Sequence, residues 1–156
     1  MEAVQGARIA QIAHTDDLLR PSVERRVVVR PKPIGWQFDW IRLEQEVLQP
    51  TRAGRPARHQ RYDWITDQLA EWCTVWADGL LIVEGIFALR QEPSSYYNPP
   101  FWVECSRDLR LQRGQARDGE QAALQWEEDW MKEEDRYIGA QRPHLNVRKS
   151  ILGMPA

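Results

Sequence analysis

The fold is decided by residues 80–85, with the sequence Leu80-Leu81-Ile82-Val83-Glu84-Gly85. Four large apolar residues in a row, entered through Asp78-Gly79, predict a short strand that is buried on both faces, as in parallel sheets. Such a strand ends at the carboxyl edge of its sheet, where open α/β proteins bind their ligands. Glu84 is therefore a candidate carboxylate of a binding site. The alternative is that Glu84 only marks the point where a buried strand meets water.

Composition bounds the class of protein. The 156 residues are 42% hydrophobic, which predicts a single globular domain over residues 1–156 with a sizeable core. There is no run of about 18 apolar residues and no secretory-type N-terminus, so we expect a cytoplasmic protein without a membrane partner. A net charge of -2 gives no general attraction to nucleic acid. Cys73 and Cys105 form no metal-ligand motif and are expected to be buried, reduced thiols.

Strand-like and helix-like stretches alternate along the chain, which predicts an α/β domain with a mostly parallel sheet. Most of the eight tryptophans fall at helical spacings, so we expect them to pack in the core. The predicted strands are residues 7–13, 80–83, 101–104 (also buried) and 147–152, with residues 26–30 as a short edge strand or hairpin arm. The predicted helices are residues 40–48, ended by Pro50, and residues 62–76, 108–117 and 120–137.

Two further features carry charge to specific places. Asp16 and Asp17 come directly after the first predicted strand, where one carboxylate could accept a proton or hold a metal-bound water. An Asp-Asp pair is also an ordinary way to start a helix. A loop predicted over residues 51–61 contains four arginines and a histidine, and it either steers an anionic substrate or is simply solvated.

Arginine dominates the basic residues, because the 21 Lys and Arg residues include three lysines, Lys32, Lys132 and Lys149. The guanidinium group is a planar fork of donors that suits phosphate and carboxylate. Arg110, Arg113 and Arg117 follow one another at spacings of three and four, which places them on one face of the predicted helix. This is the geometry that an anion clamp needs.

Four stretches occur in an order that is similar to a known family. The chain from about residue 7 to residue 152 resembles the uridine kinase and phosphoribulokinase-like branch of the P-loop nucleoside and nucleotide kinases. The resemblance implies a three-layer α/β fold with a mostly parallel sheet, in which residues 106–140 form a lid-like helical segment. The four stretches are His14-Thr15-Asp16-Asp17 after a strand, Gly54 to Arg61 leading into Tyr62-Asp63-Trp64, Val83-Glu84-Gly85-Ile86, and residues 110–119.

The resemblance implies roles for individual residues, with ATP and Mg²⁺ as cofactors. Asp16 resembles the general base that takes the proton of the substrate hydroxyl, and Glu84 resembles the carboxylate that helps to hold Mg²⁺. The phosphates of ATP would be bound by lid arginines, and the nucleoside or small hydroxyl metabolite by a second group of residues. The lid arginines are Arg110, Arg113 and Arg117, and the substrate residues are Tyr62 and Asp63, with Asp39 near the sugar hydroxyls.

The sequence departs from this family at two places. Phosphoryl transfer in this fold relies on a G-x-x-x-x-G-K-[ST] loop after the first strand, and none of the three lysines follows such a loop. The resemblance is therefore to a kinase-like domain that is N-terminally incomplete, without the phosphate loop and the first strand. The family also commonly has a histidine soon after the Tyr-Asp pair, where this chain has Thr66-Asp67, which argues against uridine as the substrate.

Two functions follow from this sequence. The first is an ATP-dependent phosphotransferase to a hydroxyl of a nucleoside or small metabolite, truncated or inactive as given, or completed by another polypeptide. The alternative is a non-catalytic anion-binding or protein-interaction module derived from such a kinase. Because a sheet without its central strand has unpaired edges, we expect a homo-oligomer or a partner that covers the exposed edge.

Overall fold

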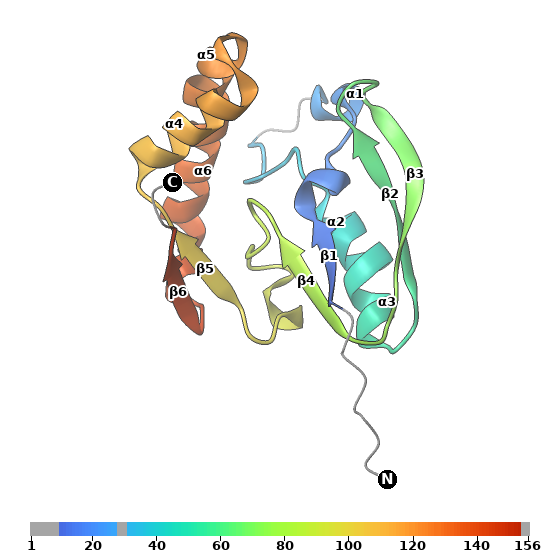
Figure 1. The fold of residues 1–156 in the computed structure, drawn as a ribbon. Coiled ribbons are helices and arrows are strands. Elements are labelled where there is room, and N and C mark those ends of the chain that lie inside the picture. The colour runs from blue at the N-terminus through green and yellow to red at the C-terminus, as the bar shows by residue number, and fades with distance from the viewer. Residues whose placement is uncertain (1–9, 28–30, 154–156) are drawn as a thin grey trace. The chain divides into compact units, whose positions relative to one another are not determined.

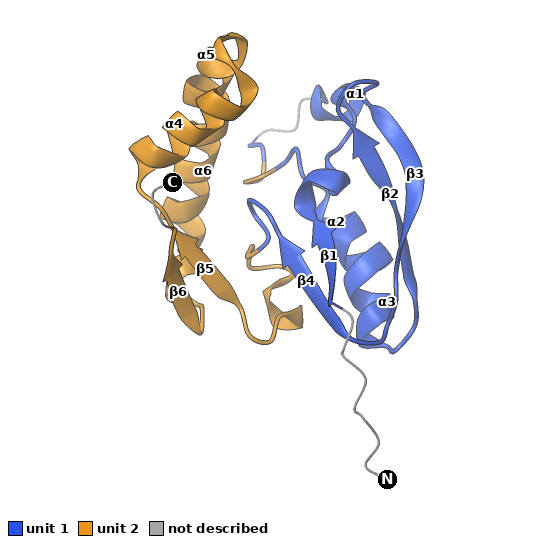
Figure 2. Cartoon of the chain, viewed as in Figure 1, with its two compact units in different colours: residues 1–32, 36–88 blue, residues 33–35, 89–156 orange. Residues whose placement is uncertain are grey.

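The computed structural model describes residues 10–27 and 31–153. They form two compact units, unit 1 within residues 1–32 and 36–88 and unit 2 within residues 33–35 and 89–156 (Figure 2). Compact units of this kind can be parts of one domain, so the single domain over residues 1–156 stays a prediction. Within the described ranges no helix is both long and apolar enough to cross a membrane.

Unit 1 is built on two parallel strands, β1 (Ala10–His14) and β4 (Leu80–Glu84), which pair from Ala10 with Leu80 to His14 with Glu84 (Figure 1). Both were predicted, although residues 7–9 of the first strand lie outside the described residues. The predicted strand or arm at residues 26–30 also falls largely outside them. The buried apolar side chains of unit 1 are Ala13, Leu18, Leu19, Phe38, Leu43, Val47, Leu48, Ala57, Tyr62, Val75, Phe87 and Ala88.

The prediction that residues 80–83 are buried on both faces is wrong. Ile12 and Ile82 pair across the strands and point to the same face, where they are 54% and 41% exposed, and Leu80 beside them is 53% exposed. The opposite face is covered, because Ala13 is 1% exposed. An apolar run therefore marked the strand correctly, but burial depends on whether a second layer covers each face, which the run itself does not specify.

A helix over residues 40–52 supports the covered side of unit 1. It consists of α2 (Trp40–Arg42), a π-helical segment η2 (Leu43–Leu48) and α3 (Gln49–Arg52). Asp39 is its N-cap, since the carboxylate accepts a hydrogen bond from the Arg42 amide at 3.2 Å. The prediction that Pro50 ends the helix is wrong. The wide π turn precedes the proline, and the Thr51 hydroxyl donates to the Val47 carbonyl at 2.7 Å, so the helix continues to Arg52.

A β-hairpin replaces the predicted loop and helix over residues 51–76. Strand β2 (Ala57–Asp63) pairs antiparallel with β3 (Gln68–Val75), and β2 packs on the helix 40–52 and on the short 3₁₀ turn η1 (Thr15–Leu18) (Figure 1). Burial alternates along β2, with Ala57, His59 and Tyr62 buried and Arg58 exposed between them. The apolar residues of β3 fall by coincidence at spacings of three and four, which imitates a helix.

Three tryptophans of this region are on the surface. Trp64, Trp72 and Trp76 are 51%, 53% and 59% exposed, so the expectation that the tryptophans pack in the core is wrong here. Cys73, expected on a helix, lies on β3, and both it and Cys105 are free and half-buried. Within residues 10–27 and 31–153 these three side chains stay largely uncovered, whereas the same side chains on a core helix would be buried.

Unit 2 pairs two parallel strands, β5 (Phe101–Glu104) and β6 (Lys149–Leu152), and carries most of the remaining helices. Both strands were predicted, but the expected burial of residues 101–104 is wrong, because Val103 is 63% exposed. Helix α4 (Arg107–Asp118) begins after the Ser106 cap, which was not predicted, and ends at Gly119, where the break was predicted. The helix predicted over residues 120–137 consists of four consecutive segments that extend to residue 141. They are η4 (Glu120–Ala122), α5 (Ala123–Gln125), η5 (Trp126–Trp130) and α6 (Met131–Gln141).

The smaller elements connect these. They are α1 (Ser22–Arg25) in unit 1, and η3 (Ser94–Tyr96) and η6 (Pro143–Leu145) in unit 2.

The helices of unit 2 meet at a glycine. Gly114 of α4 is buried, and a Cβ atom built on it would lie 2.4 Å from Cε2 of the Trp126 ring. Trp126 also donates from its indole nitrogen to Asp118 at 2.9 Å and stacks edge-on against Trp130. The ring therefore occupies the space that any side chain at position 114 would need.

We expect Gly114→Ala to destabilise the protein by about 1–3 kcal/mol, because the methyl group overpacks the Trp126 ring. Gly139→Ala is the control, since Gly139 lies on α6 with no atom within 4 Å of its Cβ position. That substitution should stabilise the protein by about 0.5–1 kcal/mol through helix propensity. Urea unfolding of both variants measures the difference, and equal stabilities would contradict the packing.

Candidate active site

The carboxyl ends of β1 and β4 bring a histidine and a carboxylate together. His14 and Glu84 are the last residues of their strands and pair in register. Nδ1 of His14 contacts Oε1 of Glu84, and the two side chains are 51% and 53% exposed. Glu84 therefore lies at the edge where it was predicted. His14 was missed, although its place at the end of a predicted strand, directly before the acidic pair, was a usable signal.

A close contact between Thr15 and Gly85 fixes this edge. Thr15 is buried and its hydroxyl donates to the Ile86 carbonyl at 3.1 Å. Gly85 has a φ of 131°, and a Cβ atom there would lie 2.0 Å from the Thr15 hydroxyl oxygen. No side chain can occupy position 85 while Thr15 keeps its place. The contact sets Glu84 and the start of η1 at a fixed distance from one another.

The acidic pair follows Thr15 directly, within η1. Asp16 is exposed, whereas Asp17 is half-buried, with a carboxylate oxygen 3.9 Å from Nε2 of His59 on β2. The N-cap position of η1 is His14, and no side chain caps the turn. The two carboxylates therefore face different surroundings, and Asp16 is the one open to solvent beside the Glu84 edge.

The three residues predicted to bind substrate all have local partners. The Tyr62 hydroxyl donates to Asp67 at 2.7 Å and accepts from Arg25 at 3.0 Å. Asp63 accepts from the Ile65 and Thr66 amides at 2.8 Å and 3.2 Å and so forms the hairpin turn. Asp39 caps the helix 40–52 and pairs with Arg20 at 2.8 Å. These contacts explain why the residues are ordered, and a role in substrate binding stays a prediction for each.

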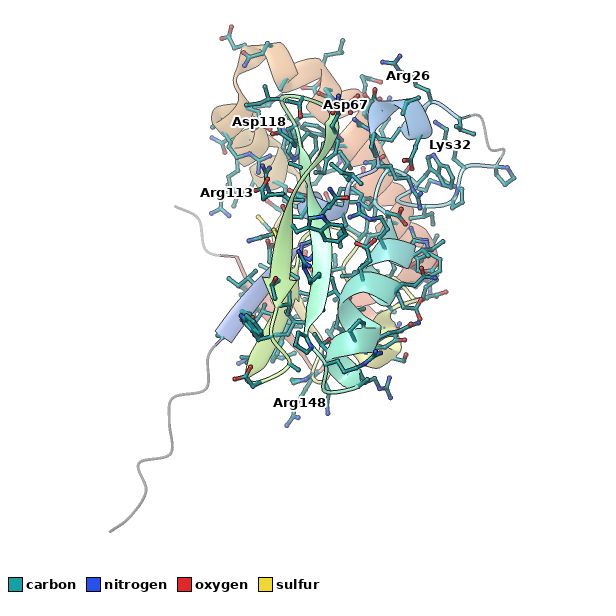
Figure 3. All side chains as sticks on the ribbon, turned by 90° about the vertical axis from the view of Figure 1, so that its right-hand side faces the viewer. Arg26, Lys32, Asp67, Arg113, Asp118 and Arg148 are labelled. Carbon is teal, nitrogen blue, oxygen red and sulfur yellow. The ribbon has the colours of Figure 1, made fainter. Side chains whose placement is uncertain are left out.

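Asp67 fastens the hairpin turn to the body of unit 1. It lies at the turn end of the hairpin with a φ of 54° (Figure 3). Its carboxylate accepts from the Ser22 amide at 2.8 Å, from Tyr62 and from Arg25 at 3.3 Å. Hydrogen bonds from Ser22, followed by the one from Tyr62, hold the pKa of Asp67 well below its ordinary value of 3.8. Burial and the hydrogen bond to Asp67 raise the pKa of Tyr62, so the phenol stays protonated as a donor.

Asp67→Asn should lower the melting temperature at neutral pH. The pKa of Asp67 is lower in the folded chain than in the unfolded chain. The ionised carboxylate therefore contributes its full stabilisation above the unfolded-state pKa, and this stabilisation is lost as the pH falls through the folded-state pKa. The difference from the unsubstituted chain should therefore shrink between about pH 4 and pH 2. Melting curves across this range test it, with the exposed Asp78→Asn as control. A difference that stays constant with pH would contradict the assignment.

The arginines predicted as an anion clamp lie on α4 in unit 2, and their surroundings differ. Arg110 is half-buried, forms an ion pair with Glu134 at 3.1 Å and donates to the Cys105 carbonyl at 2.7 Å. Burial raises the pKa of Glu134. Arg113 and Arg117 are exposed, and Arg117 pairs with Asp118 at 2.7 Å and lies over the Trp126 ring at 5.6 Å. Figure 3 marks Arg113 and Asp118. Arg110 thus supports the helix packing, while the other two stay accessible to an anion.

Glu84 could serve as a single carboxylate ligand of Mg²⁺ at this edge of the sheet. Among the described residues no group of three or more His, Cys, Asp or Glu side chains is arranged to hold a metal ion. Mg²⁺ is usually bound by one or two carboxylates together with water and substrate phosphates, not by a complete protein cage. An exposed Glu84 fits such a site as a single ligand, and it does not fit a structural metal centre.

Comparisons with known proteins connect the chain to one fold. No protein-family model matches the sequence, and no curated protein is significantly similar to it. Among solved structures, the chain is similar to that of a possible uridine kinase from Bacillus stearothermophilus, with a TM-score of 0.66 and 19% identity over 94% of this chain and 73% of that one. The chain therefore has an α/β fold that is P-loop kinase-like. At this identity the similarity establishes the fold and nothing further.

We expect Gly85→Ala to destabilise the protein by about 2–4 kcal/mol, through the strained φ and the clash with the Thr15 hydroxyl. Gly54→Ala is the control, since Gly54 also has a positive φ, of 70°, but no atom within 4 Å of its Cβ position. Gly54→Ala should lower the free energy of unfolding by about 1–2 kcal/mol. Adding Thr15→Ala to Gly85→Ala should recover part of the loss. Chemical unfolding measures all of these, and equal losses for the two glycines would rule out the contact as the constraint.

Proposed function

We propose that this chain is a phosphotransferase of the uridine kinase type, which moves the γ-phosphate of ATP to a hydroxyl of a nucleoside or small metabolite. The observation that supports this most is the Thr15–Gly85 contact, which fixes the turn bearing Asp16 next to Glu84 at the carboxyl ends of two parallel strands. Ligands of α/β proteins bind at this edge. The fold shared with a possible uridine kinase is the second support.

The proposed mechanism gives each residue one task. Asp16 accepts the proton of the substrate hydroxyl as the hydroxyl oxygen attacks the γ-phosphorus, and the bond from that phosphorus to the β-phosphate oxygen breaks so that ADP leaves. Glu84 would hold Mg²⁺, and the bound ion would supply positive charge to neutralise the phosphate oxygens. Arg113 and Arg117 bind phosphate as charge-assisted donors. Tyr62, Asp63 and Asp39 order the surroundings of the substrate.

The usual phosphate-binding loop of this kinase type is not part of the 156 residues. The 156 residues contain no G-x-x-x-x-G-K-[ST] loop, whose backbone amides normally hold the phosphates. Nucleotide binding by this chain therefore depends on side chains in place of the loop, or on a phosphate loop supplied by another polypeptide segment. A purified chain that binds nucleotide without such a segment would favour the first.

Calorimetric titration with Mg·ATP, followed by a transfer assay with a panel of nucleosides and sugar alcohols, tests the proposal. Asp16→Asn should lower kcat by about 10²–10⁴-fold while leaving ATP binding intact, because it removes the base. Glu84→Gln should weaken binding in the presence of Mg²⁺ more than in its absence. Asp129→Asn, an exposed carboxylate on η5, is the control. Transfer at an unchanged rate by Asp16→Asn would overturn the assignment of the base.

A second candidate function is a non-catalytic module that binds an anion or another protein. The observation in its favour is the exposed apolar face of the β1–β4 pair, made by Ile12, Leu80 and Ile82. An uncovered apolar sheet face usually marks an interaction surface. Nucleotide binding without transfer to any acceptor, together with a dimer or a captured partner in light scattering, would favour this function over the kinase.

A further inference from the structure

His59 is a buried imidazole without a hydrogen-bond partner. It lies in the middle of β2 and is 2% exposed, and neither ring nitrogen has a hydrogen-bond partner within residues 10–27 and 31–153. Buried polar side chains are almost always hydrogen-bonded, and an unpaired one destabilises the folded state. An apolar side chain of similar size would fill the same space without this penalty. Such departures from good packing are expected at functional sites.

The surroundings of His59 contain one nearby anion. Asp17 of η1 places a carboxylate oxygen 3.9 Å from Nε2 of His59. Cys73 lies directly opposite His59 in the hairpin register and so points to the same face. Burial raises the pKa of Cys73, which keeps the thiol neutral, and the neighbouring Arg61 and Glu71 pair with each other at 2.6 Å. Asp17 therefore lies within ion-pair distance of the imidazole, and its carboxylate also interacts electrostatically with Arg61.

Asp16 is held between two anchored neighbours. On one side the buried Thr15 donates to the Ile86 carbonyl, and on the other side Asp17 turns inward to His59, with its side chain 22% exposed. Asp16 between them remains exposed. Two adjacent carboxylates in one short turn repel each other. The buried imidazole lies beside one of them, so Asp17 faces inward while Asp16 stays exposed at the sheet edge.

We propose that His59 is a positioning residue for the acidic turn, which acts through Asp17 to fix the direction of Asp16 at the carboxyl end of β1. This inference rests on the proposed function for the role of Asp16 as base. Its structural part does not need turnover. His59 does not touch the substrate, because its ring nitrogens are buried.

The first test is spectroscopic. Long-range ¹H–¹⁵N spectra of the imidazole rings report the chemical environment of the His59 nitrogens in the full chain. Asp17→Asn should shift the His59 ring nitrogens clearly, whereas Asp16→Asn should leave them almost unchanged. His144, which lies in η6 of unit 2, is the internal reference. Ring nitrogens of His59 that do not respond to Asp17→Asn would overturn the proposal.

The second test separates positioning from packing. His59→Leu removes the unpaired nitrogens, so it should melt at the same or a higher temperature, while the amides of residues 15–18 exchange about tenfold faster with solvent. His59→Gln keeps polar atoms in the same place and should retain more of the protection. Tyr97→Phe is the control, because it removes another buried polar atom without a hydrogen-bond partner, in unit 2. It should leave the exchange of residues 15–18 unchanged.

The outcomes distinguish this inference from the proposed function. If the chain transfers phosphate, His59→Leu should lower kcat by about tenfold with KM for ATP unchanged, since geometry at the base is altered but nucleotide binding is not. If no transfer is detected, the kinase function fails, while the ring shifts and the amide exchange still test His59. A stable His59→Leu variant with unaltered exchange in η1 would show that His59 only fills space. If both His59 variants fail to fold, the Asp17→Asn spectrum decides.

Discussion

The contact between Thr15 and Gly85 is the constraint on which the candidate site depends. A hydroxyl oxygen occupies the position of a missing Cβ atom, and the glycine adopts a φ of 131° to allow it. Thr15 and Gly85 directly follow the two parallel strands. Their contact therefore fixes how the carboxyl ends of β1 and β4 lie beside each other. His14, Glu84 and Asp16 are the immediate neighbours in sequence of the two contacting residues. Their positions therefore follow from one close approach of backbone and side chain.

The β2–β3 hairpin also restrains the acidic turn η1, because β2 packs against it. β2 packs on η1, and it carries both the buried His59 and Tyr62. Tyr62 and Arg25 bind Asp67, which holds the hairpin turn in place through its left-handed backbone. Unit 1 thus surrounds the acidic turn with fixed elements on two sides, which is the preorganisation that a general base requires. Unit 2 has its own internal constraint, the ring of Trp126 against Gly114.

The sequence allowed part of this structure to be predicted, for identifiable reasons. The strands at residues 80–83 and 101–104 were predicted because apolar runs are typical of parallel strands. Helix α4 was predicted from its helix-like stretch and the break at Asp118-Gly119, although its Ser106 cap was not. The hairpin at residues 57–75 was missed because Ile65, Leu69, Trp72 and Trp76 happen to repeat at helical spacing, and its turn is made by Asp63 and Asp67 without a glycine. Burial could not be predicted, since it depends on which layer covers Ile82 or Val103.

The candidate site was predictable to a similar degree. Glu84 and Asp16 were predicted as site residues from their positions at or after a strand end, because ligands of α/β proteins bind at that edge. The structure shows those positions, and the roles of both residues stay predictions. His14 was missed although its position before the acidic pair was a usable signal. His59 was missed because a single histidine has no pattern, and its neighbours in space are known only from the structure. The face shared by Arg110, Arg113 and Arg117 follows from helical spacing, but the ion pair between Arg110 and Glu134 does not, because it joins residues far apart in sequence.

The central claim is that the edge fixed by Thr15 and Gly85 is a site for a metal–nucleotide complex. Paramagnetic broadening of the backbone amide resonances by Mn²⁺·ATP tests it most directly, because the effect falls steeply with distance from the ion. The account predicts that the amides of residues 14–17 and 84–86 broaden first, while those of the turn at Gly54 stay sharp. Broadening that is absent, or that is centred away from residues 14–17 and 84–86, would contradict it.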